Sequence, residues 1–173
     1  RLFVQPQFDS AKIIQGFEAL VRWHHPERGL VPPAVFIGVA EESELIVEIG
    51  RWVLAEACRF IFRLASAGRP LPVSVNVSPR EFHRRDFVDR VKKIVLESGA
   101  DPNYLVLEVT EGLVISEVEM VIGKMDALAA IGIRFSIDDF GTGYSSLAYL
   151  KRLPISELKI DKTFVQDAPH DPN

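Results

Sequence analysis

The sequence predicts an α/β fold in which parallel strands form a barrel, and two observations lead to this prediction. Strand patterns of period two alternate with helical patterns along the chain, which is typical of parallel strands joined by right-handed crossovers. Several successive strands also carry polar residues on one face, and in a barrel one face of every strand points at a common axis. An open dinucleotide-binding sheet is disfavoured, because no Gly-x-Gly-x-x-Gly follows the first strand and no Walker-type glycine loop occurs.

Alternating apolar and polar residues predict roughly six strands. They cover residues 2–8, 14–23, 73–77, 105–110, 133–139 and 155–161. In the strand that begins at Ile133, the apolar side chains share one face, and the adjacent carboxylates Asp138 and Asp139 come where the strand ends.

Helices are predicted between these strands from apolar stripes and from capping residues. Pro33 is expected at the start of a helix over 34–41, and a longer helix covers 51–67. A capping box at 78–81 starts one helix that ends at Gly99, and a second box, Ser116 with Glu119, starts a helix that ends at Gly132. A short helix over 145–153 ends before Pro154.

Composition excludes several classes of protein. The chain has 173 residues, 47% hydrophobic and 25% charged, which is ordinary for one globular domain. Its net charge of -4 argues against binding to a nucleic acid polymer or to a membrane surface. The single cysteine, Cys58, lies in an apolar helical pattern and is expected in the core of a protein from a reducing compartment. With no signal peptide or membrane-spanning run, we expect the cytoplasm, or the cytoplasmic part of a membrane-tethered protein.

Polar residues come toward the carboxyl ends of successive strands, where barrel enzymes build their active sites. They are Glu18, Asn76, Glu108, Asp138 and Lys159 with Asp161. Because buried carboxylates must be paired or bound to metal, convergent carboxylates and an amide predict an all-oxygen site for Mg²⁺ or Mn²⁺. Asp139 would allow a second ion, and two neighbouring ions are the usual device for displacement at phosphorus.

Each of these residues also has a simpler interpretation. Asn76 alone would bond a loop, Glu108 alone could form an ion pair with Arg22, and Lys159 alone would be a surface lysine. His24 and His25 are adjacent in a predicted loop, so we expect structural or exposed roles for them rather than metal binding. The repetition of one pattern over several strands favours the common site.

The motifs resemble those of the EAL domain family over the chain from Gln5-Pro6 onward. The most specific of them runs from Asp138 to Leu147. The others are Glu18-Ala19-Leu20 with Val21-Arg22-Trp23, Val75-Asn76-Val77-Ser78, Glu108-Val109-Thr110-Glu111 and Leu158-Lys159-Ile160-Asp161. The resemblance implies a single EAL domain over residues 1–173, with a modified TIM-like (β/α)8 barrel.

The resemblance also implies an activity, namely metal-dependent hydrolysis of cyclic di-GMP to linear pGpG with Mg²⁺ or Mn²⁺, two ions in all. It implies that Glu18, Asn76, Glu108, Asp138 and Asp139 hold metal, with Glu18 also counted as catalytic. Lys159 would position and polarise the attacking water with Asp161 nearby, and Glu111 would hold the loop after Asp139. Gln5, Leu20 and Arg22 would contact the substrate.

The same resemblance leaves alternatives. The family continues with further strands that carry additional glutamates and a glutamine, so we expect the sequence to be an incomplete EAL domain, and hydrolysis belongs to the longer protein. A catalytically inactive EAL domain that binds cyclic di-GMP or a protein partner is the second hypothesis, and a barrel hydrolase for another phosphodiester is the third. A homodimer and fused sensor or GGDEF domains are the expected partners.

Overall fold

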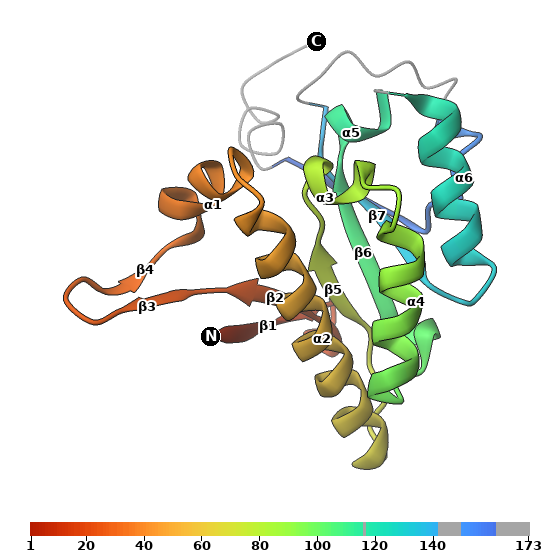
Figure 1. Ribbon diagram of the computed structural model, residues 1–173. Helices are drawn as coiled ribbons and strands as arrows, with labels where there is room; N and C mark the ends of the chain where they lie inside the picture. The colour runs from red at the N-terminus through yellow and green to blue at the C-terminus, as the bar shows by residue number, and fades with distance from the viewer. Residues whose placement is uncertain (116, 142–149, 162–173) are drawn as a thin grey trace, which may run out of the picture.

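The computed structural model describes residues 1–115, 117–141 and 150–161 of the chain. In this part, six strands form one curled sheet in the order β1-β2-β5-β6-β7-β8. Their bounds are Leu2–Phe8 (β1), Ile14–Val21 (β2), Val73–Asn76 (β5), Leu105–Thr110 (β6), Arg134–Phe140 (β7) and Glu157–Ile160 (β8). The curled sheet with its helices forms part of the predicted barrel (Figure 1).

Strands β2, β5, β6, β7 and β8 are parallel to their neighbours, as the alternating pattern predicts. The first strand is an exception, because β1 pairs with β2 in the antiparallel direction. Their connection is a short turn in which Oδ1 of Asp9 accepts hydrogen bonds from the N–H groups of Ala11 and Ile13, both at 2.9 Å. A turn of this length cannot form the crossover that a parallel pair requires.

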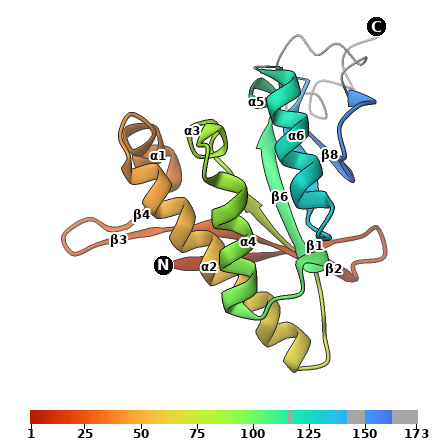
Figure 2. The ribbon, with the colours of Figure 1, turned by 45° about the vertical axis from the view of Figure 1, so that its right-hand side comes forward.

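Helices α2 (Leu45–Ser66), α4 (Phe87–Ser98) and α6 (Val118–Ala129) cover one face of the sheet (Figures 1 and 2). The main hydrophobic core lies between these helices and the sheet. It includes Phe135 and Ile137 of β7, Leu107 of β6, and Cys58, whose burial agrees with its predicted place in the core. Further elements are the hairpin β3 (Trp23–His25) and β4 (Gly29–Val31), helices α1 (Pro33–Glu41), α3 (Pro79–His83) and α5 (Glu111–Ile115), and the 3-10 turn η1 (Pro102–Tyr104).

Several predicted boundaries are wrong. The single helix expected from Ser78 to Gly99 is two helices, α3 and α4, and Arg84 between them has an extended backbone. The ammonium of Lys124 on α6 accounts for this break, because it donates hydrogen bonds to the carbonyls of Phe82 and Arg84 and so completes the end of α3. The strand expected over 14–23 ends at Val21, the helix expected from residue 51 begins at Leu45, and the last strand is shorter than 155–161.

Two predicted features lie outside the described residues, at least in part. These are the cap at Ser116 and most of the helix over 145–153.

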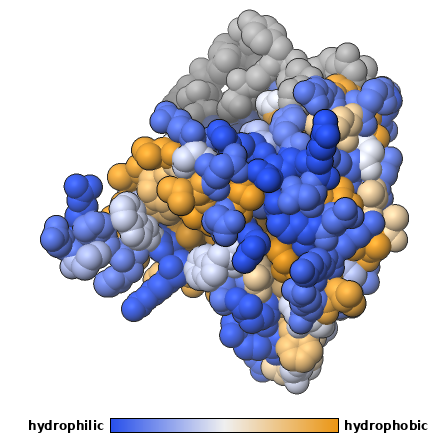
Figure 3. All heavy atoms as spheres, in the orientation of Figure 1, coloured by the Kyte–Doolittle hydropathy of each residue, from blue (hydrophilic) through white to orange (hydrophobic). Residues whose placement is uncertain are grey.

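On the surface, exposed apolar side chains gather over α1 and the start of α2 (Figure 3), among them Val35, Val39 and Leu45.

Candidate active site

Four strands bring polar side chains to one point at the carboxyl edge of the sheet. Glu18 comes from β2, Asn76 from β5, Glu108 from β6 and Lys159 from β8. The amide Nδ2 of Asn76 donates a hydrogen bond to Oε1 of Glu18 at 3.0 Å. The Nζ atom of Lys159 lies 3.4 Å from Oε2 of Glu18 and also forms an ion pair with Oε1 of Glu108.

The strand register explains why these residues meet. Asn76 lies directly opposite Glu108 in the β5–β6 pair, and Glu18 lies opposite Ser74, two residues earlier on the same face of β5. Since side chains alternate between faces along a strand, Glu18, Asn76 and Glu108 all point to the concave side of the curled sheet. Asp138 is opposite Thr110 in the β6–β7 pair, so it lies on the same face of the sheet, two residues beyond the position opposite Glu108.

Glu108 is the most deeply buried carboxylate of the group, with 1% of its surface exposed. Within the described residues, neither of its oxygens makes a hydrogen bond of good geometry, although the Lys159 ammonium lies against one of them. Burial raises the pKa of Glu108, and Lys159 opposes that shift. Burial also disfavours the charged form of Lys159, but Glu108, Glu18 and Asp138 together outweigh it and raise the pKa of Lys159.

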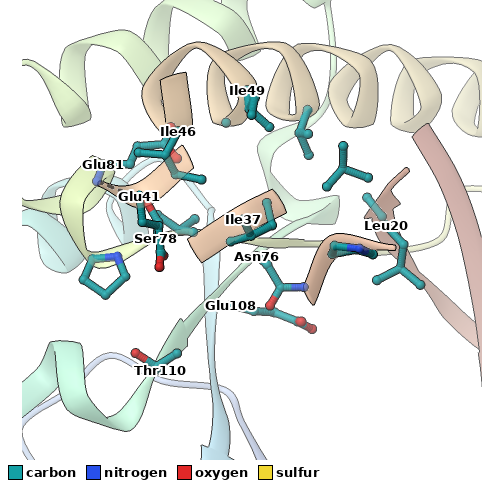
Figure 4. A pocket seen from close by; sticks show the side chains of 17 residues that line it. Leu20, Ile37, Glu41, Ile46, Ile49, Asn76, Ser78, Glu81, Glu108 and Thr110 are labelled. Carbon is teal, nitrogen blue, oxygen red and sulfur yellow. Dashed lines mark hydrogen bonds between the residues drawn. The ribbon is translucent and has the colours of Figure 1, made fainter. Parts of the chain in front are cut away.

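A hollow of about 300 Å³ opens beside this cluster, between α1, the start of α2 and the ends of β2, β5 and β6 (Figure 4). Its apolar wall includes Leu20, Ile37 and Ile49, and its polar lining includes Asn76, Glu108, Ser78 and Thr110. Apolar walls with a few convergent polar groups are typical of sites for small molecules.

Asp138 and Asp139 lie at an irregularity of the sheet. The register of β7 with β8 shifts between Ile137 and Phe140, and Asp139 has a left-handed backbone with φ of 52°. Burial, followed by the charges of Asp138 and Asp161, raises the pKa of Asp139. The bulge therefore leaves Asp139 near the charges of Asp138 and Asp161, which disfavour the ionised form of Asp139.

Glu111 is buried at the start of α5, and its Oε2 accepts a hydrogen bond from the N–H of Gly141 at 3.0 Å. This contact ties the chain after Asp139 and Phe140 to the end of β6.

The remaining predicted residues lie around the cluster. Gln5 is opposite Glu18 on β1, and Leu20 lines the hollow. Arg22 donates a hydrogen bond to the carbonyl of Val21 at 2.9 Å, so the ion pair with Glu108 is made by Lys159 and not by Arg22. Asp161 directly follows β8, and its N–H donates to the carbonyl of Phe140 at 3.5 Å.

The two histidines singled out in the sequence lie away from the cluster, on the projecting hairpin. His24 is exposed, and Nδ1 of His25 accepts hydrogen bonds from the N–H groups of Glu27 and Arg28 at 3.1 and 3.2 Å. The expectation of structural or exposed roles is confirmed. Among the described residues, no three His, Cys, Asp or Glu side chains form a ready-made metal cluster.

Glu81 is a buried residue of the hollow whose position the sequence does not reveal. The capping pattern correctly predicts that Ser78 begins a helix, and the Ser78 hydroxyl accepts from the N–H of Glu81 at 3.2 Å. The same pattern gives no sign that the Glu81 carboxylate is buried against two other helices, because those contacts join distant parts of the chain.

Comparison with known proteins agrees with this arrangement. The sequence profile of the EAL domain matches residues 1–173. The chain belongs to the EAL domain family. A solved structure of the PaMucR phosphodiesterase in complex with c-di-GMP has a TM-score of 0.92 and 43% identity, with 99% of this chain and 70% of that chain covered. The EAL enzyme Bd1971, bound to cAMP and cyclic di-GMP, has a TM-score of 0.89 and 36% identity, over 99% of this chain and 48% of that chain.

Some curated relatives of this EAL domain carry names that refer to cyclic di-GMP. The bifunctional diguanylate cyclase/cyclic di-GMP phosphodiesterase MucR of Pseudomonas aeruginosa is 46% identical over 90% of this chain. The cyclic di-GMP phosphodiesterase PdeR of Escherichia coli is 38% identical over 97% of this chain. The chain spans 23% of the length of MucR and 25% of the length of PdeR. No helix in the described ranges is long and apolar enough to cross a membrane.

Proposed function

We propose that this EAL domain is the catalytic part of a phosphodiesterase that opens cyclic di-GMP to linear pGpG with the help of divalent cations. The observation that carries the proposal is the convergence of Glu18, Asn76, Glu108 and Lys159 from four strands beside the hollow. The names of MucR and PdeR supply the substrate, since both are called cyclic di-GMP phosphodiesterases.

The residues fit a hard divalent cation. Glu18, Glu108 and Asp138 offer carboxylate oxygens, Asn76 offers an amide oxygen, and such donor sets suit Mg²⁺ or Mn²⁺. Glu108 is the most deeply buried of these carboxylates, and its Oε1 already pairs with the positive charge of the Lys159 ammonium, so its surroundings favour a cation beside it. Asp139 would serve a second ion. When bound, the cations would lower the pKa of the attacking water and stabilise charge on the phosphoryl oxygens.

The protein side chains position the reactants. The ammonium of Lys159, between Glu18 and Glu108, can orient a water molecule and stabilise developing negative charge. Asp161 lies beside this region at the end of β8, and Glu111 holds the backbone after Phe140. We propose that Leu20, which lines the hollow, packs on a guanine base, and that Gln5 and Arg22 contact other parts of the substrate.

Product analysis tests the proposal. The protein is incubated with cyclic di-GMP and Mn²⁺, with and without a chelator, and the nucleotides are separated by chromatography. We expect chelator-sensitive pGpG, and its loss in Glu18→Ala and Asp138→Ala. Normal turnover in either variant would exclude the proposed metal ligands. Cyclic di-GMP retained intact on the protein would instead identify a binding module, and equal turnover of a generic phosphodiester would identify a hydrolase of broader specificity.

We also infer the setting in which the domain works. Because the chain spans about a quarter of MucR and PdeR, we place it beside further domains, such as sensor or GGDEF domains. We propose that it acts as a homodimer in the cytoplasm. Light scattering of the purified protein tests the dimer, since a monomeric mass at assay concentrations would contradict it.

A further inference from the structure

The short helix α3 begins three residues after Asn76, and its position is set by contacts with other helices. It has five residues and begins at Pro79, with Ser78 as its cap. A helix of this length has no stability of its own, so tertiary contacts decide where it lies. Only Val77 and Ser78 separate α3 from Asn76, so the position of the first residue of α3 also restrains the backbone next to Asn76.

Contacts from three directions hold α3. On one side Arg80 donates to the carbonyl of Glu41 at 3.0 Å and pairs with Glu44 at 3.1 Å. On another side Lys124 of α6 binds the carbonyls at its end. The Arg80 and Lys124 contacts are exposed or are made to backbone carbonyls. The third contact is different, because it is made by the buried carboxylate of Glu81.

Glu81 lies against α2 and α4, with its side chain 6% exposed. A Cβ atom added at Gly50 of α2 would overlap the Glu81 carboxylate, so the glycine makes room for it. Arg90 of α4 approaches that carboxylate to 3.6 Å, and the Arg90 side chain is itself mostly buried. Glycine inside a helix lowers helix stability, and here the close approach of Glu81 accounts for it.

Stability alone does not explain a carboxylate at this place. Burial raises the pKa of Glu81 to about 7, although Arg90 opposes the shift, so the ionised form is disfavoured by its surroundings. Replacing a buried ion pair with apolar groups of similar size is often neutral or stabilising. The contact therefore serves to fix geometry. Glu81 and Asn76 line the same hollow (Figure 4). The Asn76 amide in turn donates a hydrogen bond to Glu18.

We propose that Glu81, held between Gly50 and Arg90, is a positioning residue that fixes the start of α3 and thereby directs the Asn76 amide at Glu18. Asn76 matters for catalysis only if the proposed function is correct, but the positioning itself can be observed without turnover. Glu81 acts through α3 and needs no contact with substrate or metal.

NMR signals of the asparagine side-chain amides report directly on the orientation of Asn76. The sequence holds three asparagines, Asn76, Asn103 and Asn173. Selective ¹⁵N labelling therefore gives few side-chain amide signals. Asn103 donates to Asp101 at 2.8 Å far from Glu81 in the chain, and it serves as an internal reference. Spectra are recorded without metal or substrate, so the result does not depend on the proposed function.

Gly50→Ala and Glu81→Ala are the test variants, and Gly123→Ala is the matched control. Gly123 is also inside a helix, α6, but a Cβ there would meet nothing within 4 Å. We expect both test variants to shift the Asn76 amide signals and to speed their exchange with water, with Asn103 unchanged. Gly123→Ala and the isosteric Glu81→Gln should leave Asn76 as in the wild type.

A purely structural role for Glu81 predicts a different result. In that case Gly50→Ala and Glu81→Ala lower the melting temperature but leave the Asn76 signals and their exchange unchanged, and this outcome would overturn the proposal. If Glu81→Ala does not fold, Glu81→Met keeps the volume without the carboxylate and carries the same expectation. Failure of the wild type to hydrolyse cyclic di-GMP would count against the proposed function alone.

Discussion

Glu108 and Lys159 depend on each other at the centre of the candidate site. Glu108 is fully buried, and within the described residues the ammonium of Lys159 is the cation that lies against it. A buried carboxylate without a counter-ion is strongly disfavoured, so removal of the lysine affects stability as well as chemistry.

Lys159→Met should therefore lower the free energy of unfolding by about 3 kcal/mol in metal-free buffer, because it leaves Glu108 buried and unpaired. Urea unfolding measures this quantity. The matched control is Lys93→Met, since Lys93 pairs with Glu97 on the exposed surface of α4 and its side chain is 72% exposed. That change should stay within about 0.5 kcal/mol. Equal losses in the two variants would contradict the role given to Lys159.

Glu81 should make stability depend on pH. Its pKa is raised from 4.5 to about 7 in the folded protein, so the folded state holds a proton that the unfolded state releases over this range. Stability from this group is therefore greatest below pH 4.5 and falls as pH rises to about 7. Such a shift corresponds to roughly 3 kcal/mol at most.

Glu81→Gln removes this titration while keeping the shape of the side chain. The difference in unfolding free energy between the variant and the wild type should grow from pH 4.5 to about 7 in favour of the variant, and then remain constant. Denaturant unfolding at a series of pH values measures it. A difference that is flat across this range would show that Glu81 has an ordinary pKa.

The sequence predicts the members of the site better than their partners. Period-two alternation places Glu18, Asn76 and Glu108 on one face without knowledge of the sheet order. It does not reveal that Lys159, 141 residues from Glu18, is the counter-ion of Glu108. From the sequence alone, Arg22 is the expected ion-pair partner of Glu108. Glu81 is missed for the same reason, because its partners Gly50 and Arg90 belong to other helices.

At the scale of the element, the break between α3 and α4 shows what a local pattern lacks. The apolar stripe and the cap at Ser78 correctly predict where α3 begins. They do not predict where it ends, because the group that satisfies its last carbonyls is Lys124, about 40 residues later. A helix boundary set by a distant side chain leaves no signal in the neighbouring sequence.

Ser78→Ala should destabilise the protein by about 1 kcal/mol, because it removes the oxygen that accepts from the N–H of Glu81. Ser66→Ala is the matched control, since the Ser66 hydroxyl is exposed and donates to the carbonyl of Phe62 at the other end of a helix. It should have an effect below about 0.5 kcal/mol. Thermal unfolding of the two variants makes the comparison, and equal effects would exclude a specific cap at Ser78.

At the scale of the whole molecule, the site exists only once the sheet has formed. Its four central residues come from β2, β5, β6 and β8, and their side chains meet because the parallel strands end at one edge. Alternation of strands and helices predicts this arrangement. The antiparallel direction of β1 can also be predicted from the sequence, because the five residues 9–13 are too few for the crossover that a parallel pair requires.

The convergence of carboxylates predicts that a divalent cation stabilises the entire fold. Glu18, Glu108 and Asp138 come from three strands, so a cation that binds all three links distant parts of the sheet in the folded state alone. Binding to the folded state stabilises it by about 2.7 kcal/mol when the ligand exceeds its dissociation constant a hundredfold. Mn²⁺ should therefore raise the melting temperature of the wild type, and a chelator should reverse the rise.

Glu108→Gln separates this effect from general screening of negative charge. The substitution keeps the volume of the side chain but removes the most buried carboxylate, so the rise with Mn²⁺ should become much smaller. Sodium chloride at matched ionic strength should produce no comparable rise in either protein, because screening acts mainly on exposed charges. If Mn²⁺ raises the melting temperature equally in both, the cation binds elsewhere, and Glu108 is buried as the partner of Lys159 rather than as a metal ligand.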